Sequence, residues 1–332
     1  MQVGAGGFLR DRAGAGALPE WLRELAARPE NAGALAHWET LPSRTARFGE
    51  LQPPLPAPVQ GALESRGITR LYTHQVCAIE ALRAGRDTVV VTGTASGKSL
   101  CFHLPVLERL LEEPDATALY LFPTKALAQD QLKSLTRLAQ SGFGLAHEVR
   151  AGVYDGDTAA STRRKLRDEA NVILSNPDML HAGILPQHAR WARFLRSLRY
   201  VVIDEMHAYR GIFGSHVANV LRRLERLVRH YGGDFRYVLC SATIRNPGEL
   251  AHALTGREVA VVDDDGAPRG PRHFVFWNPP YRDEARVERA AAAFVEGKGG
   301  ADEPGRRQRR ETGESDADEE LRSRHEAIPN AV

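Results

Sequence analysis

The residues best suited to chemistry lie between a β-branched run, Thr88–Val91, and a helix-compatible stretch that starts at Leu100. They are Thr92, Gly93, Thr94, Ala95, Ser96, Gly97, Lys98 and Ser99. In a strand–loop–helix setting, small residues let backbone N–H groups turn inward around phosphates, and the helix N-terminus adds a positive dipole. Lys98 is the expected ligand of the β- and γ-phosphates, and the Ser99 hydroxyl is an expected Mg²⁺ ligand. The pattern predicts a nucleoside triphosphate site, although the strict pattern has Gly where Thr92 stands. The alternative is a chance Gly-Lys-Ser in an ordinary turn.

A second candidate group follows another apolar run, Val201–Ile203, which delivers Asp204 and Glu205 to its end. Carboxylate oxygens are hard ligands of the kind that Mg²⁺ prefers, so Asp204 is the expected Mg²⁺ ligand. Glu205 is then placed to orient or deprotonate an attacking water. An acidic pair alone is usually a solvated strand end, but an upstream phosphate loop in the same alternating pattern favours the functional interpretation.

Strand-like apolar runs alternate with helical stretches around these two groups. The runs cover residues 88–91, 118–122, 172–175, 200–203 and 237–240, and the helical stretches cover 99–111, 126–141, 161–169, 188–195 and 215–230. Continuously apolar strands separated by amphipathic helices predict an α/β fold with a parallel sheet that is covered on both faces. Ligands of such sheets bind beyond the carboxyl ends of the strands, where both candidate groups are expected.

Composition predicts four regions. They are an N-terminal extension and linker (1–56), the nucleotide-binding domain (57–263), a linker with the start of a second domain (264–295), and a charged tail (296–332). We expect the tail to be disordered because it has too few apolar residues to order itself. Its basic cluster, Arg306–Arg310, is a weaker candidate for nucleic-acid contact than for a solvated segment.

Charge, hydrophobic content and cysteine spacing of the 332 residues indicate which classes of protein fit the chain. The formal net charge is +2 and the hydrophobic content is 42%, so a large core is expected and a global basic field is not. The three cysteines are far apart and show no metal-ligand spacing, and two of them lie in apolar segments. No signal peptide or membrane-spanning run is recognised, so we expect a soluble, cytoplasmic protein without a membrane partner.

The two candidate groups and several shorter motifs resemble the first motor domain of superfamily 2 DEAD/DEAH-box helicases. Asp204-Glu205-Met206-His207 looks like motif II in its DExH form, and Gln75 looks like the glutamine that reads adenine. An amide can donate to and accept from the adenine edge at once, which explains the choice of glutamine. The resemblance covers about 51–280 and implies a RecA-like P-loop NTPase fold, with ATP and Mg²⁺ as cofactors.

Three further motifs of this family are expected to face nucleic acid or to link it to the nucleotide. The corresponding residues are Pro123, Thr124 and Lys125 (motif Ia), Asn176, Pro177 and Asp178 (motif Ib), and Ser241 and Thr243 (motif III), with His207 as a coupling residue. Taken singly, each has an ordinary alternative: an exposed helix residue for Gln75, a helix cap for Pro123-Thr124, and turn residues for motif III. Their joint occurrence in the family order favours the functional interpretation.

Finer features resemble the Hrq1/MrfA-like group, whose members are 3′→5′ DNA helicases associated with DNA repair and often carry a C-terminal zinc-binding domain. These features are Tyr154–Thr158, Ala208–His216 and His273–Pro280. Four arginines on the stretch 215–230 most simply form its solvated face, with DNA contact as the alternative.

The resemblance also implies parts that this sequence does not show. An intact superfamily 2 motor has a second RecA-like domain whose arginine fingers stabilise transition-state charge. No motif VI pattern and no zinc-binding cysteines follow Thr243, so the chain is expected to stop where the second motor domain would begin. Two hypotheses follow: a helicase-type ATPase, alone or completed by a second chain, or a truncated ATP-dependent nucleic-acid-binding module without autonomous hydrolysis. An unrelated P-loop kinase would leave Gln75 and motifs II and III unexplained.

Overall fold

The computed structural model describes residues 19–278, and these form two compact units. The larger unit runs from Thr45 to Pro268 and contains the whole of the predicted nucleotide-binding domain. The smaller unit is formed by the described residues on either side of it, up to Arg44 and from Arg269. The end of the region predicted as a linker and the start of a second domain, the charged tail and its basic cluster lie outside the described residues.

The larger unit is built on a seven-stranded sheet in which every neighbouring pair of strands is parallel. Its strands are β4 (Thr88–Val91), β5 (Thr117–Leu121), β6 (Ala151–Val153), β7 (Val172–Ser175), β8 (Leu198–Ile203), β9 (Arg236–Ser241) and β10 (Ala260–Val262). Their order across the sheet is β10-β4-β9-β8-β5-β7-β6. The predicted parallel α/β sheet is confirmed. The sequence pattern missed the two edge strands, β6 and β10, which have three residues each.

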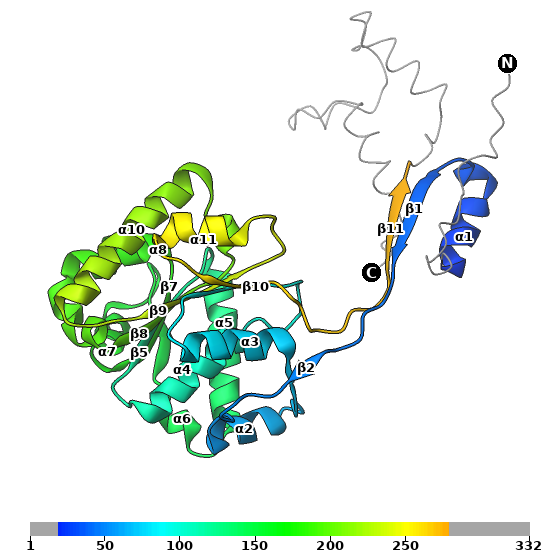
Figure 1. Ribbon diagram of the computed structural model, residues 1–332. Helices are drawn as coiled ribbons and strands as arrows, with labels where there is room; N and C mark the ends of the chain where they lie inside the picture. Colours follow the sequence, from blue (N-terminus) through cyan, green and yellow to red (C-terminus); the bar gives the residue numbers. More distant parts are fainter. Residues whose placement is uncertain (1–18, 279–332) are drawn as a thin grey trace, which may run out of the picture. The chain divides into compact units, whose positions relative to one another are not determined.

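Side chains alternate along each central strand between two apolar layers. In β4, Val90 packs into one layer, whereas Val89 and Val91 pack into the other. The first layer is covered by helices α2 (Ala57–Glu64), α3 (Thr73–Arg83), α4 (Leu100–Glu112) and α5 (Lys125–Ser141). The second is covered by α9 (Ala192–Arg196), α10 (Gly211–His230) and α11 (Pro247–Thr255). Figure 1 shows α10 and α11 on one side of the sheet and α3 and α4 on the other.

The stretch 188–195 is not the regular helix that its sequence predicts. The chain instead forms a π-turn over Leu180–Ile184, a 3₁₀ segment over Leu185–Trp191 and then the short helix α9. Pro186 lies in the 3₁₀ segment and has no N–H to donate, and Gln187 has non-helical φ/ψ angles of −104° and 26°. The apolar side chains of this stretch are nevertheless buried, because Trp191 and Phe194 pack into the second apolar layer.

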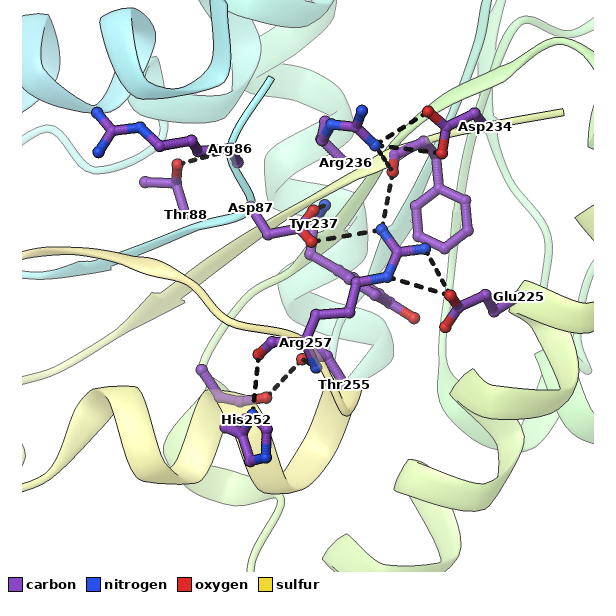
Figure 2. Close-up of polar contacts among 12 residues, drawn as sticks. Arg86, Asp87, Thr88, Glu225, Asp234, Arg236, Tyr237, His252, Thr255 and Arg257 are labelled. Atoms are coloured by element: carbon purple, nitrogen blue, oxygen red, sulfur yellow. Dashed lines mark hydrogen bonds and ion pairs between the residues drawn. The ribbon is translucent and has the colours of Figure 1, made fainter. Parts of the chain in front are cut away.

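An ionic cluster around Arg257 connects the amino ends of β4 and β9 (Figure 2). The predicted ligand sites lie at the carboxyl ends of these strands. Arg257 lies 3.3 Å from Asp87, which precedes β4, and 2.9 Å from Glu225 of α10. Its guanidinium also donates to the carbonyl of Phe235 and lies over the rings of Phe235 and Tyr237. The three charged side chains are 9–18% exposed, so this network is largely removed from water. It joins α10, β9 and the segment after α11 to the start of the phosphate-loop strand.

The smaller unit contains helix α1 (Glu20–Ala27) and a two-stranded antiparallel sheet (Figure 1). Strand β1 (Leu35–Leu41) pairs with β11 (Arg272–Trp277), so segments from opposite ends of the chain meet there. Thr40 Oγ1 and His273 Nδ1 are 2.9 Å apart across the pair.

Candidate nucleotide-binding and catalytic site

The candidate residues gather at one edge of the sheet because of the strand order. Strand β4 leads into the phosphate loop, β9 ends at Ser241 and β8 ends just before Asp204. These three strands are neighbours, with β9 between the other two, and all run parallel. Their carboxyl ends therefore meet at the same edge.

The phosphate loop is folded by two residues in the left-handed region of φ/ψ space. Ala95 has φ of 59° and Gly97 has φ of 79°. The hydroxyl oxygens of Thr92 and Ser96 are 2.6 Å apart and both residues are buried. Thr92, which departs from the strict pattern, thus closes the loop with a hydrogen bond that a glycine could not make.

Lys98 points back onto its own loop. Its Nζ donates to the carbonyl oxygens of Thr92 at 3.0 Å and of Gly93 at 2.7 Å. Ser99 is the N-cap residue of α4, so its hydroxyl lies at the positive end of that helix. The ammonium group and the helix end create an electropositive loop suited to phosphate.

Gln75 is a buried residue of α3 that contacts this loop, so the alternative of an exposed helix residue is wrong. Its Oε1 accepts from the Tyr72 N–H at 2.9 Å and its Nε2 donates to the Gly97 carbonyl at 3.1 Å. A carboxamide has two lone pairs on oxygen and two N–H donors, so each end can make one more hydrogen bond. Gly97 has φ of 79°, which favours glycine, and a Cβ there would lie 2.7 Å from Nε2 and would displace the Gln75 amide.

Asp204 and Glu205 share the turn after β8. Asp204 is 7% exposed, and its Oδ1 accepts from the Glu205 N–H at 2.9 Å. Burial is the main cause that raises the pKa of Asp204 from 3.8 to about 6; the Glu205 charge adds to the shift, while this hydrogen bond and Lys98 oppose it. Because Lys98 acts on this carboxyl, the ammonium and the carboxylate belong to one electrostatic site. Glu205 has φ of 50°, an uncommon conformation for a non-glycine residue and typical of functional turns.

His207 connects the acidic turn to β9. Its Nδ1 lies 3.2 Å from Glu205 Oε2 and 3.3 Å from Ser241 Oγ. The structure therefore brings together the residues predicted as motifs II and III, although it leaves Thr243 exposed on the surface. The imidazole thus lies between the acidic turn and β9, and its role as a coupling residue stays a prediction.

The residues predicted to hold nucleic acid follow the next two strands, β5 and β7. Thr124 caps α5 by accepting from the Leu127 N–H, as the alternative interpretation had it, and Asn176 caps the short helix Pro177–Met179. Lys125 is exposed and forms an ion pair with Asp157. Pro123 is half-buried and Asp178 is exposed, whereas Pro177 is buried. Nucleic-acid contact by these residues stays a prediction.

Two residues at this site escaped the sequence interpretation. The segment over 263–270 reads as a turn or linker, yet Asp265 is 8% exposed and accepts from the Gly93 N–H of the phosphate loop at 3.3 Å. His74, next to Gln75, is fully buried and accepts from the Gly266 N–H at 3.1 Å. Three consecutive aspartates before a glycine gave no local signal to separate the buried one from its exposed neighbours.

The described residues were also compared with the expectations for metal sites, cysteines and membrane-spanning helices. Among residues 19–278, no group of three or more His, Cys, Asp or Glu side chains is arranged to hold a metal ion. Mg²⁺ in nucleotide sites needs only one or two protein ligands beside phosphates, so Ser99 and Asp204 fit that role. Cys101 and Cys240 are buried and Cys77 is exposed. No helix in the same range is long and apolar enough to cross a membrane.

Known proteins are similar to this chain in sequence. The chain is 45% identical over 262 residues to the uncharacterized ATP-dependent helicase YprA of Bacillus subtilis, covering 79% of this chain and 35% of YprA. It is 40% identical over 266 residues to the ATP-dependent helicase HRQ1 of Saccharomyces cerevisiae, covering 79% of this chain and 24% of HRQ1. The chain thus spans about a third or less of the length of these relatives.

A solved structure agrees with the sequence relatives. The crystal structure of the DUF1998 helicase MrfA bound to DNA and AMPPNP is similar with a TM-score of 0.75 and 42% identity, over 85% of this chain and 39% of MrfA. The resemblance expected from the motifs is confirmed. Residues 72–250, which contain the phosphate loop, the acidic pair and Gln75, match the family described as DEAD/DEAH box helicase. The chain belongs to the DEAD/DEAH box helicase family.

Proposed function

We propose that this chain is the ATP-binding, Mg²⁺-dependent motor domain of a superfamily 2 DNA helicase. The observation that carries the proposal is the meeting of the phosphate loop and the acidic pair at one edge of the sheet, after the two strands that flank β9, with Lys98 acting on the pKa of Asp204. An isolated phosphate loop would need no such partner.

Each residue of the site has a distinct task in this proposal. Lys98 leaves the loop carbonyls and binds the β- and γ-phosphates, while Gln75 reads adenine with its remaining donor and acceptor. Ser99 and Asp204 would hold Mg²⁺, which neutralises charge on the phosphates. Glu205 orients the attacking water and accepts its proton, and His207 passes the state of the acidic turn to Ser241.

Coupling to DNA is proposed from the relatives and from the position of the candidate residues. MrfA is bound to DNA in its crystal structure, and the predicted contact residues here follow β5 and β7, at the same sheet edge as the nucleotide site. Unwinding, a role in DNA repair and a partner domain or chain with arginine fingers are proposals for the complete motor, because this chain spans only part of its relatives.

The rate of ATP hydrolysis by the purified chain, with and without single-stranded DNA, tests the proposal. The Glu205→Gln variant controls for contaminating activity, because it keeps the binding residues and lacks the base. DNA-stimulated hydrolysis that this variant loses supports a motor domain. ATP binding without hydrolysis supports the second candidate, an ATP-dependent nucleic-acid-binding module, and absence of ATP binding contradicts both.

A further inference from the structure

We propose that Asp265 is a positioning residue of the nucleotide site. Its carboxylate anchors the first peptide group of the phosphate loop and so keeps the loop in the shape that receives ATP. This inference rests on the proposed binding of ATP. We call the segment Asp263–Pro268, which carries this residue, the strap.

The strap turns a single carboxylate inward. Asp265, Gly266 and Ala267 are buried, whereas Asp263 and Asp264 are exposed. Both oxygens of Asp265 are engaged: Oδ2 accepts from the Gly93 N–H at 3.3 Å, and Oδ1 accepts from the Ala267 N–H at 3.0 Å. The hydrogen bond within the strap fixes the orientation of the carboxylate, so the contact with the loop does not depend on a freely rotating side chain.

His74 accepts a hydrogen bond from the backbone of the strap. The Gly266 N–H donates to His74 Nδ1 at 3.1 Å, so this nitrogen carries a lone pair and the neutral ring has its proton on Nε2. Asp265 Oδ1 lies 3.8 Å from the same nitrogen, which is too long for a hydrogen bond. The His74 ring therefore contacts the strap through the Gly266 backbone N–H, and the Asp265 carboxylate keeps its hydrogen bond to the loop.

The strap is also tied to the start of α3, the helix that carries Gln75. The Arg47 N–H donates to the Gly266 carbonyl at 2.8 Å, and the Thr73 N–H donates to the Arg47 carbonyl at 3.0 Å. A Cβ on Gly266 would lie 2.3 Å from Thr73 Oγ1 and 2.8 Å from the Arg47 carbonyl oxygen. The strap consequently lies against these backbones at a distance that only glycine permits.

Side chains from outside the phosphate loop thus form hydrogen bonds with its backbone near both of its ends. Gln75 holds the Gly97 carbonyl, and Asp265 holds the N–H of the peptide group between Thr92 and Gly93. The carbonyl of that same peptide group accepts from Lys98 Nζ. When Lys98 turns toward phosphates, this peptide group loses one of its two partners and Asp265 remains as the other. The carboxylate therefore maintains the start of the loop while its lysine moves.

Calorimetric titration of the full chain with ATP and Mg²⁺ tests this role, using Asp265→Ala, Asp265→Asn and, as the matched control, Asp263→Ala. Removing a hydrogen bond to a charged group is expected to weaken ATP binding about tenfold or more in Asp265→Ala. Asp265→Asn should regain only part of the affinity. Its single amide oxygen can still accept from the Gly93 N–H, but its NH₂ group then faces the Ala267 N–H and cannot accept from it. Asp263→Ala removes an exposed carboxylate of the same strap and should bind like the wild type. Should Asp265→Ala fail to fold, Asp265→Glu replaces it, since the longer side chain keeps the charge but displaces the oxygen, and the same loss is expected.

Two results would overturn the inference. Unchanged affinity in Asp265→Ala would mean that the contact is incidental, and tighter binding would mean that the carboxylate competes with phosphate. A purely structural role would lower the unfolding midpoint of the nucleotide-free chain without changing the affinity of the folded protein. Failure of the wild-type chain itself to bind ATP would instead contradict the proposed function, so the two failures are distinguishable.

Discussion

The buried carboxylate of Asp204 should destabilise the nucleotide-free protein at neutral pH. Replacing Asp204 with asparagine should therefore increase the free energy of unfolding. Burial raises its pKa from 3.8 to about 6, and the ordinary value applies to the unfolded chain. The folded state therefore binds the proton more tightly, so folding is favoured at low pH and loses that advantage as pH rises through about 6. Asparagine stays neutral, and its amide oxygen retains the acceptor for the Glu205 N–H.

The magnitude follows from the difference between the two pKa values. About two pH units at about 1.4 kcal/mol each give about 3 kcal/mol at pH 8, where Asp204 is ionised in both states. At pH 5 the folded carboxyl is largely protonated, and the gain from Asp204→Asn should fall to about half of that value. Such a cost is typical of a site that is shaped for a ligand and not for stability.

Urea denaturation of wild type and Asp204→Asn at pH 5 and pH 8 measures this gain. The difference between the two proteins cancels the contributions of all other titrating groups. Asp263→Asn is the matched control, because it removes one negative charge from an exposed position. The reasoning is refuted if Asp204→Asn is no more stable than wild type at pH 8, or if its advantage does not grow between pH 5 and pH 8.

Other variants test separate parts of the account. Arg257→Met should lower the free energy of unfolding by about 3 kcal/mol in urea denaturation, because the mostly buried Asp87 loses its ion-pair partner, whereas Glu225 keeps its ion pair with Arg229. A loss below about 1 kcal/mol would contradict a stabilising role of this ionic cluster. Gln75→Glu should weaken ATP binding and reduce discrimination against GTP in a competition assay, because a carboxylate oxygen would face the Gly97 carbonyl in place of a donor; unchanged discrimination would exclude an adenine-reading role. Glu205→Gln should retain ATP affinity while hydrolysis is lost, and residual DNA-stimulated turnover would assign the base elsewhere.

Much of the nucleotide site was predictable because its parts are local in sequence. A phosphate loop needs only a strand, small residues and a helix start, which lie within the short span from Thr88 to Leu100. The acidic pair likewise follows its strand directly. Parallel strands then bring these separate signals to one edge, so the fold class was enough to predict that they meet.

The missed features depend on long-range contacts or on very short elements. Asp265 and Gly93 are separated by 172 positions, and nothing within Asp263–Asp265 distinguishes the residue that turns inward. Strands β6 and β10 have three residues each, too few for a periodic pattern to stand out. The expected helix over 188–195 has helical periodicity, but the chain is a 3₁₀ segment up to Trp191 and becomes α-helical only over Ala192–Arg196.

The central claim is that the phosphate loop binds ATP through Lys98. Calorimetric titration of wild type and Lys98→Ala with ATP and Mg²⁺ tests it most directly, with the thermal unfolding of both nucleotide-free proteins as the check on folding. The account predicts saturable binding by wild type and no measurable binding by a folded Lys98→Ala variant, because the loop would lose its only lysine ammonium. Equal affinity of the two proteins would contradict the assignment of the loop and the function built on it.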